Sequence, residues 1–163
     1  MITLLPACSS GIHNKPENIA NEFLDRISDK KTSELNELFY TTDTFNPDSY
    51  FEQFYGVCKI GFGDNYKIKF SNITISDFEL EDSELFGNIN TKFYGIDTSR
   101  PISDYMKVSF KWSIAGSLDS SVDESSFLVV KEGDKWYIHD CLAASYFTLT
   151  VIGDAERLDG VLD

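Results

Sequence analysis

Hydrophobic residues in the first part of the chain recur three and four positions apart, which is the spacing of a helix face buried against a core. Asn14 is a capping residue type and Pro16 suits a first helical position, so the pattern predicts a helix from there to about Lys30. Thr32 is the expected cap of a second helix. The apolar positions of these two helices are Ile19, Phe23, Leu24 and Ile27, then Leu35, Leu38 and Phe39.

A third helix is predicted to begin at Asn46 and Pro47, again a capping residue followed by proline. Three glycines weaken the pattern toward its end, so we expect the helical part to stop by Asp64. Its buried stripe is expected to consist of Tyr50, Phe51, Phe54, Tyr55 and Cys58.

From Tyr66 onward the apolar residues alternate with polar ones, a period of two that is typical of strands with one buried face. The alternation shifts phase at Ser71 and Asn72, which predicts a β-bulge in the first strand. A strand from Tyr105 to Ala115 alternates most regularly. The other predicted strands are Leu85–Tyr94, Phe127–Lys131 and Lys135–Asp140, and a polar turn at Glu132–Asp134 joins the last two.

Three helices followed by about five antiparallel strands predict an α+β domain whose helices cover the apolar face of the sheet. The element order, the bulged first strand and the final hairpin, SFLVVKEGDKWYI at residues 126–138, resemble the NTF2-like (cystatin-like, SnoaL-like) superfamily. The resemblance is to its small bacterial lipoprotein type and covers residues 15–142. It implies a sheet curved around the helices as a cone, and it leaves the function open because such domains serve as enzymes and as binding modules. Residues 143–163 are expected to be a C-terminal extension.

Residues 1–14 resemble the end of a bacterial lipoprotein signal followed by a tether. Leu5, Ala7 and Cys8 occupy the positions of a lipobox, which implies lipidation of Cys8 and a place on the periplasmic side of the envelope. Seven residues before Cys8 are too few for a complete signal peptide. Either the true start lies upstream of Met1, or the resemblance is accidental and the protein is cytoplasmic.

The three cysteines are Cys8, Cys58 and Cys141. If Cys8 carries lipid, Cys58 and Cys141 remain as a pair, and an oxidising envelope would permit a disulfide between them. Two separate buried thiols are the alternative.

The chain has 27 acidic and 14 basic side chains, a net charge of −13. This charge disfavours nucleic acid and anionic lipid and favours a basic protein partner. Five acids gather between the first two predicted strands, either as a solvated loop or as a docking edge, and the docking reading rests on Glu79, Glu81 and Asp82. Four lysines on the polar face of the sheet are expected to pair with acids on neighbouring strands: Lys67, Lys69, Lys107 and Lys111.

Catalysis would need a carboxylate and a donor inside the cone. Enzymes that resemble ketosteroid isomerase use a carboxylate base with Tyr donors in an apolar pocket. Asp140 is the best acid candidate here and Tyr55 a candidate donor, beside Tyr40 and Tyr105. The alternative, which the sequence favours, is that Asp140 is a strand-end residue that makes a turn or capping hydrogen bond.

Aromatic residues of the sheet, Phe110, Trp112 and Trp136, suit either a ligand pocket or core packing. His139 and Cys141 invite comparison with a metal site, but the chain lacks the second close ligand pair of a structural zinc site. No nucleotide fingerprint is present, and we expect neither a metal nor a cofactor.

Taken together, these features favour a non-catalytic binding module of the bacterial cell envelope. Its expected partner is a basic protein or a small apolar ligand, and an immunity or inhibitor protein that blocks a toxin or wall hydrolase is one form of it. A small isomerase-like or cyclase-like enzyme is the alternative. A homodimer through the outer face of the sheet is a third reading.

Overall fold

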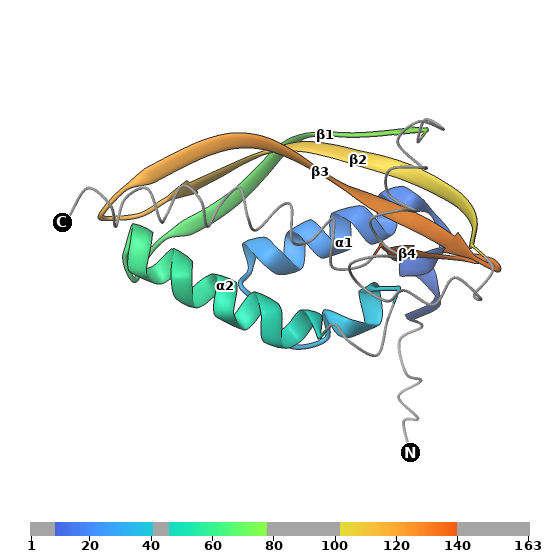
Figure 1. Cartoon of the computed structure of the whole chain (residues 1–163), viewed down its shortest axis with the longest axis horizontal. Helices are drawn as coiled ribbons and strands as arrows, with labels where there is room; N and C mark the ends of the chain where they lie inside the picture. Colours follow the sequence, from blue (N-terminus) through green and yellow to red (C-terminus); the bar gives the residue numbers. More distant parts are fainter. Residues whose placement is uncertain (1–8, 41–45, 78–101, 140–163) are drawn as a thin grey trace, which may run out of the picture.

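The computed structural model describes residues 9–40, 46–77 and 102–139. Within them, two α-helices lie against one face of a four-stranded antiparallel sheet whose strands follow chain order, β1-β2-β3-β4 (Figure 1). This confirms the α+β class in its coarse form. The elements are η1 (Ser9–Asn14), α1 (Pro16–Ser28), η2 (Asn36–Leu38), α2 (Pro47–Phe62), β1 (Lys67–Asp77), β2 (Ile102–Ala115), β3 (Ser120–Glu132) and β4 (Lys135–Ile138).

Both α-helices begin with proline at a first-turn position, as the sequence predicts. Asn46 caps α2, and its side chain accepts a hydrogen bond from the Ser49 amide at 3.1 Å. The cap predicted for α1 is wrong. Lys15 occupies the capping position without a side-chain hydrogen bond, because Asn14 lies inside the short 3-10 helix η1 that precedes it.

The second predicted helix is also wrong, since only the 3-10 turn η2 forms in that segment. Glu34 has φ of 69°, which interrupts helical geometry just before the turn. The side chain of Asp48 accepts hydrogen bonds from the amides of Leu35 and Asn36 at 2.8 and 3.1 Å. Side-chain contacts to α2 therefore satisfy backbone groups that a helix would have satisfied internally.

The sheet confirms the predicted bulge and extends three of the predicted strands. The register of β1 against β2 shifts between Ser71 and Thr74, and Asn72 between them has φ of 53°. Strand β3 begins at Ser120, seven residues before its predicted start, because mostly polar residues outside the hydrophobic core continue its pairing with β2. Strand β4 ends at Ile138. The predicted strand 85–94 and the extension 143–163 lie outside the described residues.

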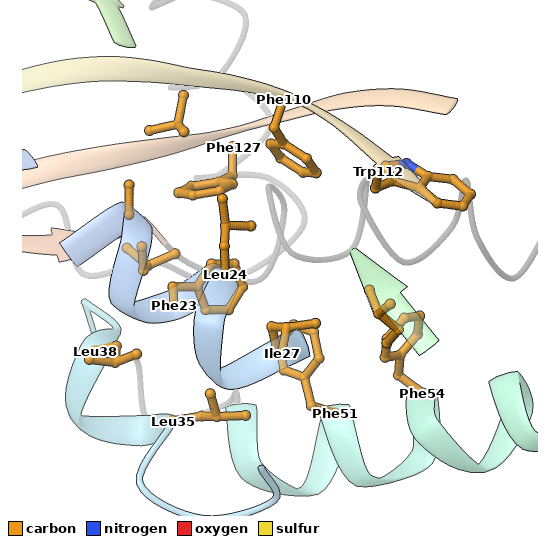
Figure 2. Close-up of a cluster of buried hydrophobic side chains, with 14 of the residues drawn as sticks. Phe23, Leu24, Ile27, Leu35, Leu38, Phe51, Phe54, Phe110, Trp112 and Phe127 are labelled. Carbon is orange, nitrogen blue, oxygen red and sulfur yellow. The ribbon is translucent and has the colours of Figure 1, made fainter. Parts of the chain in front are cut away.

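Helix α1 packs directly against the sheet, where it contacts β1, β3 and β4. Phe23 of α1 meets three rings from different segments in edge-to-face contacts, with centroids 5.5 Å from Phe39, 5.6 Å from Phe51 and 5.2 Å from Phe127. Phe23, Phe51 and Phe127 are labelled in Figure 2. Such contacts stabilise a core beyond the area they bury. The described helices, sheet and η2 therefore share one hydrophobic core.

Helix α2 also reaches the turn between β2 and β3. The amide of Leu118 donates a hydrogen bond of 3.2 Å to the carbonyl of Phe62 at the end of α2. Gly116 lies so close that a Cβ placed on it would come within 1.8 Å of the same carbonyl oxygen. Close backbone contact, and not side-chain packing, joins the two elements here.

None of the helices in the described ranges has the length and apolar character needed to cross a membrane.

Candidate functional site

The aromatic residues considered for a ligand pocket belong to the core. Phe110, Trp112 and Trp136 are 3%, 1% and 6% exposed, and all three are part of the same buried cluster. The ring of Phe110 lies 5.7 Å from that of Phe127, an inner-face neighbour on β3 (Figure 2). Of the two roles that the sequence allows for these rings, the contacts support core packing, because the rings are buried against other side chains of the protein.

A buried polar cluster lies where α2 meets the start of β1. The Tyr66 hydroxyl donates a hydrogen bond of 3.1 Å to the carbonyl of Tyr55. The ammonium group of Lys30 donates to the carbonyl of Tyr66 at 2.6 Å and lies 3.7 Å from the centre of its ring. These contacts connect the segment after α1 and helix α2 to Tyr66, the residue immediately before β1.

The phenols of Tyr55 and Tyr66 and the nearby thiol of Cys58 stay neutral at physiological pH. Burial raises the pKa of Cys58 to about 12, with a smaller opposing effect of Lys30. Burial also raises the pKa values of Tyr55 and Tyr66. Cys58 is fully buried, so it lacks the accessible thiolate that nucleophilic catalysis requires. Its predicted partner Cys141 lies outside the described residues, and the disulfide stays a prediction.

The Tyr55 hydroxyl is buried without a hydrogen-bond partner among the described residues. An unsatisfied buried hydroxyl costs about 1 to 3 kcal/mol of stability. We therefore expect Tyr55→Phe to raise the free energy of unfolding by about 1 kcal/mol, measured by urea denaturation. The matched variant Tyr66→Phe removes a hydroxyl that does donate a hydrogen bond, and it should lower stability by about the same amount. Equal losses in both variants would show that Tyr55 has a partner.

The other catalytic candidates are not gathered around Tyr55. Tyr105 lies on the sheet opposite Val130, and Tyr40 stacks on His139 with ring centroids 6.4 Å apart. Both rings lie near the end of β4, since Tyr105 is 6.2 Å from His139. The catalytic candidate Asp140 lies outside the described residues. So do the predicted lipidation site Cys8 and the three predicted docking acids, Glu79, Glu81 and Asp82.

No group of three or more His, Cys, Asp or Glu residues in the described part of the chain is arranged to hold a metal ion. The ring nitrogen Nδ1 of His13 instead lies 2.6 Å from the carbonyl oxygen of Trp136. His139 is 2% exposed, and its amide donates a hydrogen bond of 2.8 Å to the carbonyl of Leu128. Both described histidines thus contact the backbone of the β3–β4 hairpin.

Arg26 is a buried cation that the sequence pattern does not single out. It lies 2.7 Å from Glu22 and 2.8 Å from Glu37, and it also donates a hydrogen bond to the carbonyl of Glu34. Its pKa is raised because hydrogen bonds to the two glutamates outweigh its burial. The contacts hold the segment after α1 against that helix, which is a structural role.

Four lysines lie on the outer face of the sheet, which points away from the helices: Lys67, Lys69, Lys107 and Lys111. The prediction that its lysines pair with acids across the strands is wrong for three of them, because Ala115 stands opposite Lys67, Ser113 opposite Lys69, and Ser76 and Leu128 opposite Lys107. Lys111 stands opposite Glu124, yet no ion pair joins Lys111 to any described residue. These four lysines thus form no ion pair within the described ranges, on a protein of net charge −13.

A shallow groove of about 420 Å³ crosses this outer face beside the β1 bulge. Sequence reasoning assigned its lysines to the polar face but missed the groove, because a hollow depends on strand register and on the bend at the bulge. It is lined by Asn72, Thr74, Lys107, Ser109, Phe110, Lys111, Glu124, Ser125 and Ser126.

Comparison with known proteins does not assign the chain to a family. The chain matches no known protein family model, and no curated protein shows significant similarity to it.

Proposed function

We propose that the chain is a non-catalytic binding module of the bacterial cell envelope with an NTF2-like fold. In this proposal its partner is a basic protein, and it acts as an immunity or inhibitor protein does when it covers a toxin or wall hydrolase. The α+β arrangement, the lipobox-like residues around Cys8 and the net charge of −13 support it. The aromatic rings of the described core are buried in packing, so the proposal places the binding site on the surface.

The observation that carries the proposal is a row of exposed acids along α1. Glu17, Asp25 and Asp29 are spaced by multiples of four residues, so they lie along one side of the helix. Each is exposed, and none forms an ion pair with a described residue. Like charges four residues apart destabilise a helix, and the carboxylate of Asp29 lies at the C-terminal end, where the helix dipole opposes it.

Asp25 and Asp29 therefore reduce the stability of the helix that carries them. Cations of a bound partner would offset this loss of helix stability. Opposite charges also steer association and contribute to its specificity. Glu79, Glu81 and Asp82 belong to the same proposal as a second acidic contact.

The test is co-purification of the tagged chain from envelope fractions of its own cells, followed by quantitative mass spectrometry. We expect wild type to retain a basic protein that Asp25→Lys with Asp29→Lys releases, because the variant replaces attraction by repulsion. Glu79→Lys with Glu81→Lys and Asp82→Lys tests the second contact in the same way. A matched control, Asp119→Lys with Asp134→Lys, places new positive charges in the β2–β3 and β3–β4 turns and should retain the partner.

Retention by the α1 variant and the 79–82 variant alike would overturn this proposal, as would the absence of any enriched basic protein. Equal loss from the control would show that net charge alone governs the contact.

A small isomerase-like or cyclase-like enzyme is the second candidate. It is favoured by the Tyr55 hydroxyl, which has no hydrogen-bond partner in the part of the chain that the structure describes. Its raised pKa keeps this group protonated, as a donor to an enolate oxygen must be. Asp140 would be the acid or base of such a site. If Tyr55→Phe stabilises the protein as expected, the hydroxyl is unsatisfied and free to serve a ligand.

A further inference from the structure

The groove on the outer face of the sheet brings three hydroxyl groups into one cross-strand row. Thr74 of β1 stands opposite Ser109 of β2, and Ser109 stands opposite Ser126 of β3. Because neighbouring strands lie about 4.8 Å apart, the row spans about 10 Å. All three residues line the groove.

Two lysines flank this row along β2. Lys107 precedes Ser109 by two residues and Lys111 follows it by two, so all three side chains leave the same face of the strand. The two lysine Cα atoms are about 13 Å apart at an ordinary strand rise, which places Ser109 midway between two cations. Long lysine side chains can converge across such a distance on a ligand above the row.

The bulge of β1 adds a further polar group at the rim. Asn72 has φ of 53°, which lies in the left-handed region that asparagine tolerates better than most residues, and it lines the groove beside Thr74. Phe110 and Ser125, which strand alternation assigns to the inner face, complete the lining. Among the described residues of the lining, Glu124 is the one acid, and it stands opposite Lys111.

The chemistry of the lining selects a class of ligand. Hydroxyls and an amide donate hydrogen bonds, and ammonium groups supply positive charge without a fixed geometry. A tetrahedral oxyanion with several terminal oxygens can accept from hydroxyls and ammonium groups together. The groove volume of about 420 Å³ is in the range of small-molecule sites.

We infer that this groove binds the phosphate or sulfate group of a small anionic ligand, with Lys107 and Lys111 supplying charge and Thr74, Ser109 and Ser126 supplying hydrogen bonds. The net charge of −13 repels anions from the molecule as a whole, so binding here depends on these local cations. The inference stands apart from the proposed protein partner, whose acidic contacts lie on α1 and at 79–82.

The test is a titration of the ¹⁵N-labelled full chain with inorganic phosphate, followed by amide chemical shifts at constant ionic strength. We expect saturable shifts at Thr74, Ser109 and Ser126, with a Kd of roughly 1 to 10 mM for the bare ion. Lys107→Gln with Lys111→Gln should weaken binding about tenfold or more, since it removes both charges from the groove.

A matched control is available on the same face of the sheet. Lys67→Gln with Lys69→Gln removes the same charge outside the groove lining and should change the Kd by less than about twofold. The dispersion of the amide spectrum verifies that each variant is folded. A parallel titration with sulfate distinguishes the two oxyanions, and tighter binding of one assigns the ligand class.

Shifts that stay linear to roughly 100 mM of both anions would overturn the inference, since they would report a Kd far weaker than the millimolar site expected. An equal loss of affinity in the two double-lysine variants would also overturn it, because a diffuse field and not the groove would then bind the anion. A failed co-purification with normal phosphate binding would remove the proposed protein partner and leave the groove intact.

Discussion

Gly116→Ala is expected to lower the free energy of unfolding by about 3 kcal/mol or more. A Cβ at this position would lie 1.8 Å from the carbonyl oxygen and 2.7 Å from the carbonyl carbon of Phe62. Backbone atoms at the end of a packed helix cannot turn aside as a flexible side chain can, so α2 and the β2–β3 turn must separate. Overpacking with backbone displacement costs this much in well-packed proteins.

The measurement is thermal and urea denaturation followed by circular dichroism. For a chain of this length, 3 kcal/mol corresponds to a fall in Tm of roughly 6 to 12 °C. Gly56→Ala is the matched control, because a Cβ there meets no atom within 4 Å and the position lies within α2. Alanine should stabilise the helix at that position by about 0.5 to 1 kcal/mol. Similar midpoints for the two variants would show that the close contact at Gly116 does not exist.

Phe23→Ala is expected to have an effect of comparable size, about 3 to 5 kcal/mol. The ring is 1% exposed and meets Phe39, Phe51 and Phe127 in edge-to-face contacts, so its removal leaves a cavity among η2, α2 and β3. The three remaining rings belong to elements held elsewhere by their own contacts, and they cannot all move inward to fill the space.

Urea denaturation again gives the free energy, and Phe23→Leu allows the comparison if the alanine variant does not fold. Leucine keeps much of the volume and should cost roughly 1 to 2 kcal/mol. Ile60→Ala on α2 is the control, because Ile60 is 69% exposed and its truncation should change stability by less than about 0.5 kcal/mol. A Phe23→Ala loss as small as that of Ile60→Ala would contradict the placement of Phe23 at the centre of the core.

Local sequence signals predicted the elements that depend on local chemistry. Asn46 and Pro47 set the start of α2, because a capping side chain and a fixed φ act within one turn. The alternation in β2 identified its buried face correctly, from Val108 to Ile114, since side chains on a strand alternate irrespective of the pairing partner. The phase shift at Asn72 located the bulge for the same reason.

Local sequence signals gave wrong predictions where side chains from distant parts of the chain bind the backbone hydrogen-bonding groups of a segment. Thr32 and the apolar residues after it have a helical pattern, yet Asp48 from α2 and Arg26 from α1 take the hydrogen-bonding groups of that segment. The length of β3 was also underestimated, since Ser120 to Ser126 offer few hydrophobic residues and become a strand by pairing with β2. Tertiary contacts outweigh propensities that differ by a fraction of 1 kcal/mol per residue.

The same distinction between local and tertiary information applies to the candidate sites. The sequence by itself determined the net charge and the face of the sheet on which Lys107 and Lys111 lie, because composition and periodicity need no knowledge of neighbours. Only the tertiary structure decided that these lysines form no ion pair with the described acids, that three hydroxyls align between them, and that Trp112 packs in the core. Strand register and the meeting of α1 with the sheet join residues far apart in the chain, and no local pattern encodes which residues then stand opposite one another.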